Sequence, residues 1–158
     1  MVPPDPGFAR ATALRATLDP VATGDEEDPS FTGSPRPDLL DAHLDHVAAL
    51  AGEYAQRAGL PLDVVASIRW AARLHDIGKA DPTFQVWLHG GDEIAARFGD
   101  RLAKSVLPWQ SRAAVQAARA RAGYPEGQRH ELVGLHMIQA SDTLLSRIVT
   151  DGADPELV

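Results

Sequence analysis

The stretch LDVVASIRWAARLHDIGK, residues 62–79, carries apolar side chains at intervals of three and four residues. At this spacing one helical face contains Val64, Ile68, Ala71 and His75. The pattern predicts a helix over residues 62–77, ending near a glycine. His75 then lies in the last turn of the buried face, with Asp76 beside it.

The rest of the chain repeats this helical spacing. It predicts helices over residues 38–58, 83–88, 93–105, 110–122, 130–140 and 143–149, and one short helix over 8–18. No segment alternates like a strand for more than a few residues, and Pro37 suits the first turn of the helix that follows it. We therefore expect an all-α fold.

The chain has the length and composition of one ordinary domain. Residues 1–36 are rich in Pro, Gly and acidic residues and predict a flexible tail or linker, so the domain should occupy residues 37–158. The absence of cysteine excludes disulfides, cysteine nucleophiles and thiolate metal ligands. No apolar run approaches the roughly 18 residues that span a bilayer, so we expect a cytoplasmic protein without a membrane partner.

The charge is unevenly distributed. The net charge is −7, which disfavours a nucleic-acid partner, yet residues 97–129 contain seven lysines and arginines against two acidic residues. This segment is either a solvated helical face or a surface that contacts nucleic acid. The candidate nucleic-acid contacts are Arg97, Arg101, Lys104, Arg112, Arg119 and Arg129.

Two histidines and an aspartate have the chemistry of a metal site. The predicted helix over 38–58 places on one face His43, Val47, Leu50 and Tyr54. Inward histidines on consecutive helices, one of them followed by Asp76, supply imidazole nitrogen and carboxylate oxygen, which several divalent metals accept. A carboxylate can also bridge two metal ions. An inward histidine is alternatively a hydrogen-bonded core residue, and the spacing alone leaves both interpretations open.

Lys79 lies one turn beyond His75 and Asp76 and is one of only two lysines in the chain. From there its amine could reach an anionic oxygen at a metal site. An exposed lysine that complements the dipole of the helix end is the alternative.

Residues 75–82, HDIGKADP, followed by Phe84-Gln85 and by Trp87, resemble the signature of the HD superfamily of metal-dependent phosphohydrolases. More narrowly, they are similar to the HD nuclease domain of the CRISPR-associated helicase-nuclease of type I systems. Further segments agree with that family: HLDHVA at 43–48, residues 87–93 and 102–105, and residues 123–132 with their Arg-His-Glu triplet. The resemblance covers about residues 37–150.

The resemblance implies an HD-domain helical bundle that holds one or two divalent ions, with Mn, Ni, Co, Fe and Mg all compatible. It implies His43, His75 and Asp76 as metal ligands, Asp76 being the bridge, and His130 at the second metal position. Asp76 and Lys79 would be the catalytic residues, with Lys79 stabilising the phosphate or the attacking water.

The resemblance also implies a substrate and partners. The domain would act as a metal-dependent nuclease on single-stranded DNA, which a helicase motor domain or subunit unwinds and feeds to it. Both would work with a CRISPR RNA-guided effector complex.

The sequence departs from the family pattern after residue 150. The family continues with a His-His pair and a further Asp that completes the first metal shell, and this chain ends at Val158 without them. We expect a C-terminally truncated bundle, with a naturally short, degenerate relative as the alternative. Two other functions stay open: an HD phosphohydrolase acting on nucleotides, and a non-catalytic HD module that docks to a helicase or an effector complex.

Overall fold

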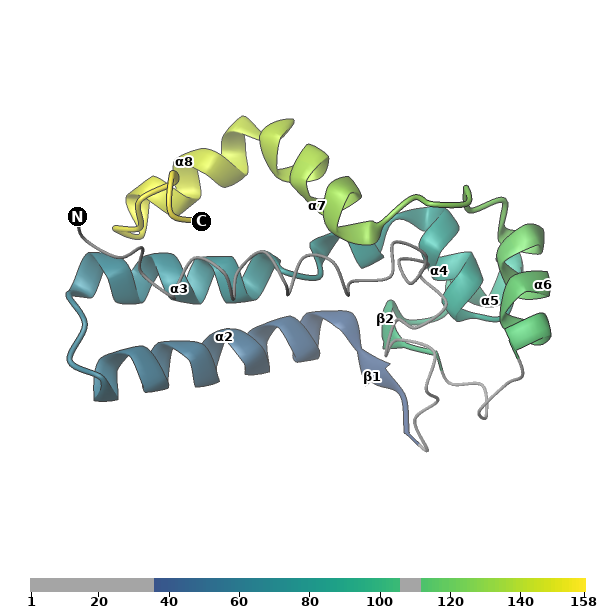
Figure 1. The fold of residues 1–158 in the computed structure, drawn as a ribbon, viewed down its shortest axis with the longest axis horizontal. Coiled ribbons are helices and arrows are strands. Elements are labelled where there is room, and N and C mark those ends of the chain that lie inside the picture. The colour runs from purple at the N-terminus through teal and green to yellow at the C-terminus, as the bar shows by residue number, and fades with distance from the viewer. Residues whose placement is uncertain (1–35, 106–111) are drawn as a thin grey trace, which may run out of the picture.

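The computed structural model describes residues 36–105 and 112–158. The predicted tail, apart from its last residue, and the predicted helix over 8–18 lie outside the described residues. Helices α2 (Leu40–Arg57) and α3 (Leu62–Leu74) form an antiparallel hairpin along the length of the molecule (Figure 1). Gly59, with φ 73°, makes the turn between them. The described part is predominantly helical, which confirms the predicted all-α class.

The face of α2 that packs on α3 consists largely of small residues. Its buried members are Leu40, Leu44, Ala48, Gly52 and Ala55. A Cβ on Gly52 would lie 2.5 Å from Cγ of Arg69, so this glycine lets the arginine stem cross the helix closely. The predicted stripe through His43 is therefore wrong in its second half, since Leu50 is 37% and Tyr54 63% exposed. His43 lies at the border of the buried face instead.

Helix α3 ends earlier than predicted. Its buried residues are Val65, Ser67 and Leu74, so the expected face ending in His75 is displaced, and His75 is exposed. Asp76 adopts φ −114° and ψ 11°, which leaves the α-helical region and starts the 3₁₀ helix η3 (Ile77–Ala80). This change of direction turns the carboxylate inward while His75 stays at the surface.

Helix α4 (Pro82–Leu88) follows η3 directly. The carboxylate of Asp81 caps its start by accepting hydrogen bonds from the backbone N–H groups of Thr83 and Phe84. Phe84 forms the centre of a buried cluster with Trp87, Leu88, Leu102, Ala118 and Tyr124. This cluster supports the end of the hairpin at which α2 begins and α3 ends.

The predicted helix over 93–105 is wrong in its second half. Helix α5 (Glu93–Phe98) is followed by strand β2 (Leu102–Lys104), which pairs antiparallel with strand β1 (Asp38–Leu39). Pro37 accordingly precedes a strand instead of opening a helix. Gln85 causes the extended conformation, because its buried side-chain amide bonds both the N–H and the C=O of Leu102, at 2.8 and 2.9 Å.

The pairing of the two strands contains a bulge. Asp38 is opposite Lys104 and Leu39 is opposite Leu102, so Ala103 has no partner residue in the ladder. The carbonyl of Ala103 is therefore available for other contacts near the start of α2.

The second half of the chain packs on α4, η3 and α3. Helix α6 (Arg112–Ala122) packs against α4 and α7 (His130–Gln139) against η3, whereas α8 (Asp142–Thr150) returns to α3 (Figure 1). Leu74, Ile148 and Ala153 form the small core between α3 and α8. Within the described residues, no helix combines the length and apolar character needed to cross a membrane.

Candidate metal centre

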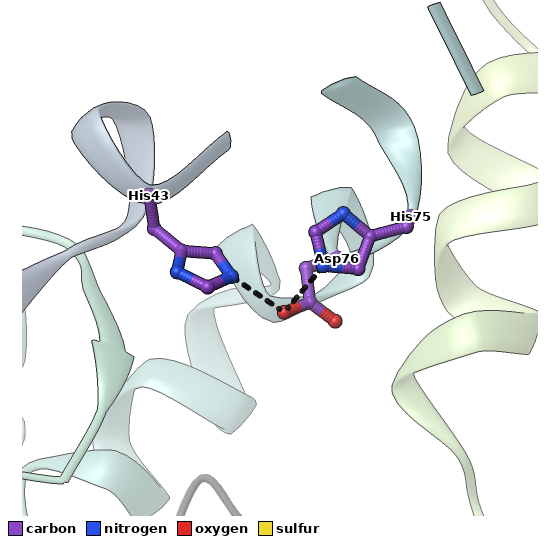
Figure 2. Close-up of side chains that lie close together, drawn as sticks. All are labelled: His43, His75 and Asp76. Carbon is purple, nitrogen blue, oxygen red and sulfur yellow. Dashed lines mark ion pairs between the residues drawn. The ribbon is translucent and has the colours of Figure 1, made fainter. Parts of the chain in front are cut away.

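The Asp76 carboxylate is the meeting point of four side chains. Its Oδ2 lies 2.7 Å from Nζ of Lys79, 3.3 Å from Nε2 of His75 and 3.6 Å from Nε2 of His43. Its Oδ1 lies 3.2 Å from Nε2 of His130. Figure 2 shows His43 and His75 approaching the same carboxylate oxygen from different sides.

The environment of Asp76 keeps it ionised. Burial raises the pKa of this carboxyl, but hydrogen bonds from His130 and Lys79 and the charge of Lys79 outweigh it and hold the pKa well below its usual range. A permanently charged oxygen therefore faces the two histidines at neutral pH.

The two histidines present the same nitrogen to this oxygen. Nδ1 of His75 lies 2.7 Å from the carbonyl oxygen of Ala72, which can only accept, so Nδ1 carries a proton and donates it. In the neutral ring the lone pair is then on Nε2, toward Asp76. Burial lowers the pKa of His43, against the raising effect of Asp38 and Asp76 nearby, which favours a neutral ring there as well.

This donor set fits a divalent metal ion. One ligand atom from each of His43, His75 and Asp76 lies within 4.8 Å of the others. Imidazole nitrogen with carboxylate oxygen suits Zn, Mn, Fe, Co and Ni, and nothing in the set selects one of them. The structure thus brings together three residues that the sequence placed in one site.

Lys79 and His130 lie on the buried side of the same carboxylate. Besides its bond to Asp76, the Lys79 ammonium is 3.4 Å from the carbonyl oxygen of Ala103, the bulged residue of β2. The His130 ring packs on Phe84 at 5.2 Å between centroids. Both side chains hold the carboxylate. The predicted roles of Lys79 toward phosphate and of His130 at a second metal position stay predictions.

A backbone contact fixes His130 against the site. A Cβ on Gly78 would lie 1.8 Å from the carbonyl oxygen of His130 and 2.6 Å from the amide nitrogen of Gly134. Only a glycine in η3 lets the start of α7 approach this closely, so the glycine of the HDIGK stretch sets the position of His130.

The predicted nucleic-acid contacts have different surroundings. Arg97 lies on α5 and is exposed, whereas Arg101, Lys104 and Arg129 make ion pairs with Asp41, Asp38 and Glu131. The side chain of Arg112 lies outside the described part of the structure. Arg119 was expected at the surface and is buried: its guanidinium lies over Trp87 and bonds the carbonyl of Tyr124.

A separate groove of about 870 Å³ runs between α2, α3 and α8. It is lined in part by Trp70, Leu144, Arg69, Arg73 and Arg147 and does not include the three metal-ligand candidates. Arg73 pairs with Asp45 and Arg147 with Asp151, so two of its cations are already neutralised. This groove could not be predicted from the sequence, because its lining residues come from three separate helices.

Comparison with protein families gives one result that covers most of the chain. The family model described as "Cas3, HD domain" matches residues 31–152. Neither the curated proteins nor the solved structures contain a match to the chain. The matched range includes all four residues around the Asp76 carboxylate.

Proposed function

The chain belongs to the Cas3 HD domain family, and we propose on that basis that it cleaves single-stranded DNA during CRISPR interference, using bound divalent metal ions. Membership of the family supports a nuclease of the HD superfamily in a CRISPR system. Beyond this, we propose that the substrate is single-stranded DNA, that a helicase motor delivers it, and that both work with an RNA-guided effector complex.

The observation that carries the proposal is the convergence of two Nε2 atoms on one charged oxygen. His43 and His75 come from different helices, and both face Oδ2 of Asp76. These three side chains would hold a divalent ion, which would supply Lewis-acid stabilisation to a phosphodiester and to water.

The chain's own residues prepare this site in two ways. The Ala72 carbonyl accepts the Nδ1 proton of His75, so that in the neutral ring the Nε2 lone pair faces Asp76. Lys79 and His130 hold the Asp76 carboxylate from behind, so its charge and direction are set in advance.

The solvent side of the site is where a DNA strand can approach. His75 is 39% and His43 22% exposed, whereas Lys79 and His130 are 7% and 8% exposed. We propose that the phosphate enters past the two exposed rings. Arg97, exposed on α5, is a candidate for contacts with the phosphate backbone of the DNA.

Metal content and DNA cleavage measured together test the proposal. The wild-type chain should bind metal and cut single-stranded DNA with Mn²⁺, Ni²⁺, Co²⁺ or Mg²⁺. His75→Ala and Asp76→Ala should lose cutting, and His136→Ala, an exposed histidine on α7, should keep it.

Two other outcomes would contradict the proposed metal site or the proposed DNA substrate. Cutting that persists in a chelator would exclude the metal site as its origin. Bound metal with hydrolysis of free nucleotides, but not of DNA, would assign the site to a nucleotide phosphohydrolase instead.

A further inference from the structure

The second ring nitrogen of His43 also faces a carboxylate. Nε2 is directed toward Asp76, and Nδ1 lies 3.7 Å from Oδ2 of Asp38. Sequence patterns gave no reason to select Asp38, which precedes the metal-ligand helix. Its position comes entirely from the short strand pair.

Asp38 is held in place by backbone pairing. It belongs to β1 and lies opposite Lys104 of β2, and the next contact of the ladder is the backbone bond from Leu40 N to Arg101 O at 2.9 Å. The Lys104 ammonium lies 3.9 Å from the same Oδ2 of this partly buried carboxylate. The strand pair therefore presents a fixed anion to one side of the His43 ring.

A neutral imidazole carries one proton, and its location decides which nitrogen can bind a metal. His75 is controlled by a backbone carbonyl, which accepts from Nδ1 at hydrogen-bond distance. No such carbonyl bond is found for His43 among the described residues. At 3.7 Å, Asp38 acts on the ring by the attraction between its charge and the N–H dipole instead of by a short hydrogen bond. Asp76 lies at a similar distance from Nε2, 3.6 Å, but its Oδ2 is already bound by the Lys79 ammonium at 2.7 Å, whereas the Lys104 ammonium is 3.9 Å from Asp38. The less neutralised carboxylate therefore faces Nδ1.

We propose that Asp38 is a positioning residue that keeps the proton of His43 on Nδ1 and thereby directs the Nε2 lone pair to the metal site. The inference rests on the proposed function, since it assigns Asp38 a role in the same site. Asp38 and Asp76 face different nitrogens of the His43 ring, so Asp38 acts on the site through that ring. The Asp38 carboxylate thus keeps the proton of His43 on Nδ1 by its charge, as the Ala72 carbonyl does for His75 by a hydrogen bond.

The first test is the tautomer of His43 in the metal-free protein. Long-range ¹⁵N–¹H correlations of ¹⁵N-histidine-labelled protein distinguish a proton on Nδ1 from one on Nε2. Wild type should show the Nδ1–H form of His43, and Asp38→Ala should shift it toward Nε2–H while the His75 signal stays unchanged. Asp38→Asn keeps an acceptor oxygen without the charge and should lie between the two.

The second test is the affinity for Mn²⁺ by titration calorimetry, without DNA. Asp38→Ala should weaken binding about 10- to 100-fold, as the loss of an outer partner of a ligand histidine does. Asp41→Ala is the matched control, because it removes an acid of the same helix start that pairs with Arg101 and not with a histidine. It should leave both the tautomer and the affinity unchanged.

An unchanged His43 tautomer with unchanged Mn²⁺ affinity in Asp38→Ala would overturn the inference. Circular dichroism would reveal a folding defect in Asp38→Ala. In that case Asp38→Asn, which keeps the shape of the side chain, replaces it in both the tautomer and the affinity measurements. If wild type binds no Mn²⁺, the proposed function fails at its metal site, and the His43 tautomer alone decides for or against Asp38.

Discussion

The two sides of the Asp76 carboxylate use similar residues for opposite purposes. On the outer side His43 and His75 are partly exposed and direct Nε2 at Oδ2. On the inner side His130 and Lys79 are buried and bonded to the same carboxylate. The comparison teaches that burial, more than residue type, distinguishes the histidines that can bind a metal ion from the side chains that hold the Asp76 carboxylate in place.

Substitutions on the inner side should therefore lower the free energy of unfolding, and substitutions on the outer side should lower the affinity for metal.

The largest expected effect comes from the backbone contact behind the inner side. Gly78→Ala should lower the free energy of unfolding by about 3 kcal/mol, because its Cβ collides with backbone atoms that no rotamer change can move. Gly134→Ala, whose Cβ would meet the Gly78 nitrogen at 3.1 Å, is the matched control and should cost about 1 kcal/mol or less. Urea denaturation measures both. Equal losses would show that the close approach is not what fixes α7.

The next effect removes the inner cation. Lys79→Met should destabilise the metal-free protein by about 3 kcal/mol, because it leaves a buried carboxylate without its partner charge. Saturating Mn²⁺ should recover part of the loss, since a bound cation replaces the missing charge. The control is Lys104→Met on β2, a partly exposed lysine that should change stability by no more than about 0.5 kcal/mol. A small loss in Lys79→Met would mean that His130 alone stabilises the charge.

The outer side should show the reverse pattern. His75→Ala should leave the free energy of unfolding within about 0.5 kcal/mol, since this ring is exposed, yet weaken Mn²⁺ binding about 100-fold. That factor corresponds to about 2.7 kcal/mol of binding free energy. Calorimetric titration beside urea denaturation separates the two quantities. Lost stability with unchanged affinity would reverse the assignment of the two sides.

The smallest expected effect compares two helix caps. Asp81→Ala and Asp92→Ala each remove a carboxylate that accepts two backbone N–H bonds, and each should cost about 1 kcal/mol. Asp81 caps α4, whose Phe84 supports the His130 ring, so only Asp81→Ala should also weaken Mn²⁺ binding, by a few-fold. Identical Mn²⁺ affinities in the two variants would show that α4 does not help to hold the inner side.

The helices were largely predictable because their apolar spacing is strong. The residue ranges of α2, α3 and α7 follow from it to within three residues, and the motif around His75 and Asp76 pointed to the family. The stripe that pointed His43 inward was wrong in detail, because a glycine and alanines, poor hydrophobic signals, form the true contact face. His43 reaches Asp76 from the border of that face.

The two strands and the buried Arg119 could not be predicted, because both depend on contacts between residues that are distant in the sequence. A strand of two or three residues is too short to show alternation, and its conformation depends on Gln85, which is distant in sequence. Asp38 and the Ala103 carbonyl enter the site only through that pairing. Arg119 looked like part of a charged surface, because nothing in a sequence shows that Trp87 will cover a guanidinium.

The arrangement of the four side chains has a consequence for how the site assembles. His43, His75 and Asp76 lie on the two arms of a single helical hairpin and its end, whereas His130 follows Asp76 by 54 residues. Closing the hairpin costs less chain entropy than bringing α7 back to η3. The ligand half of the site can thus form while the chain is still folding, and the docking of α7 completes it from behind.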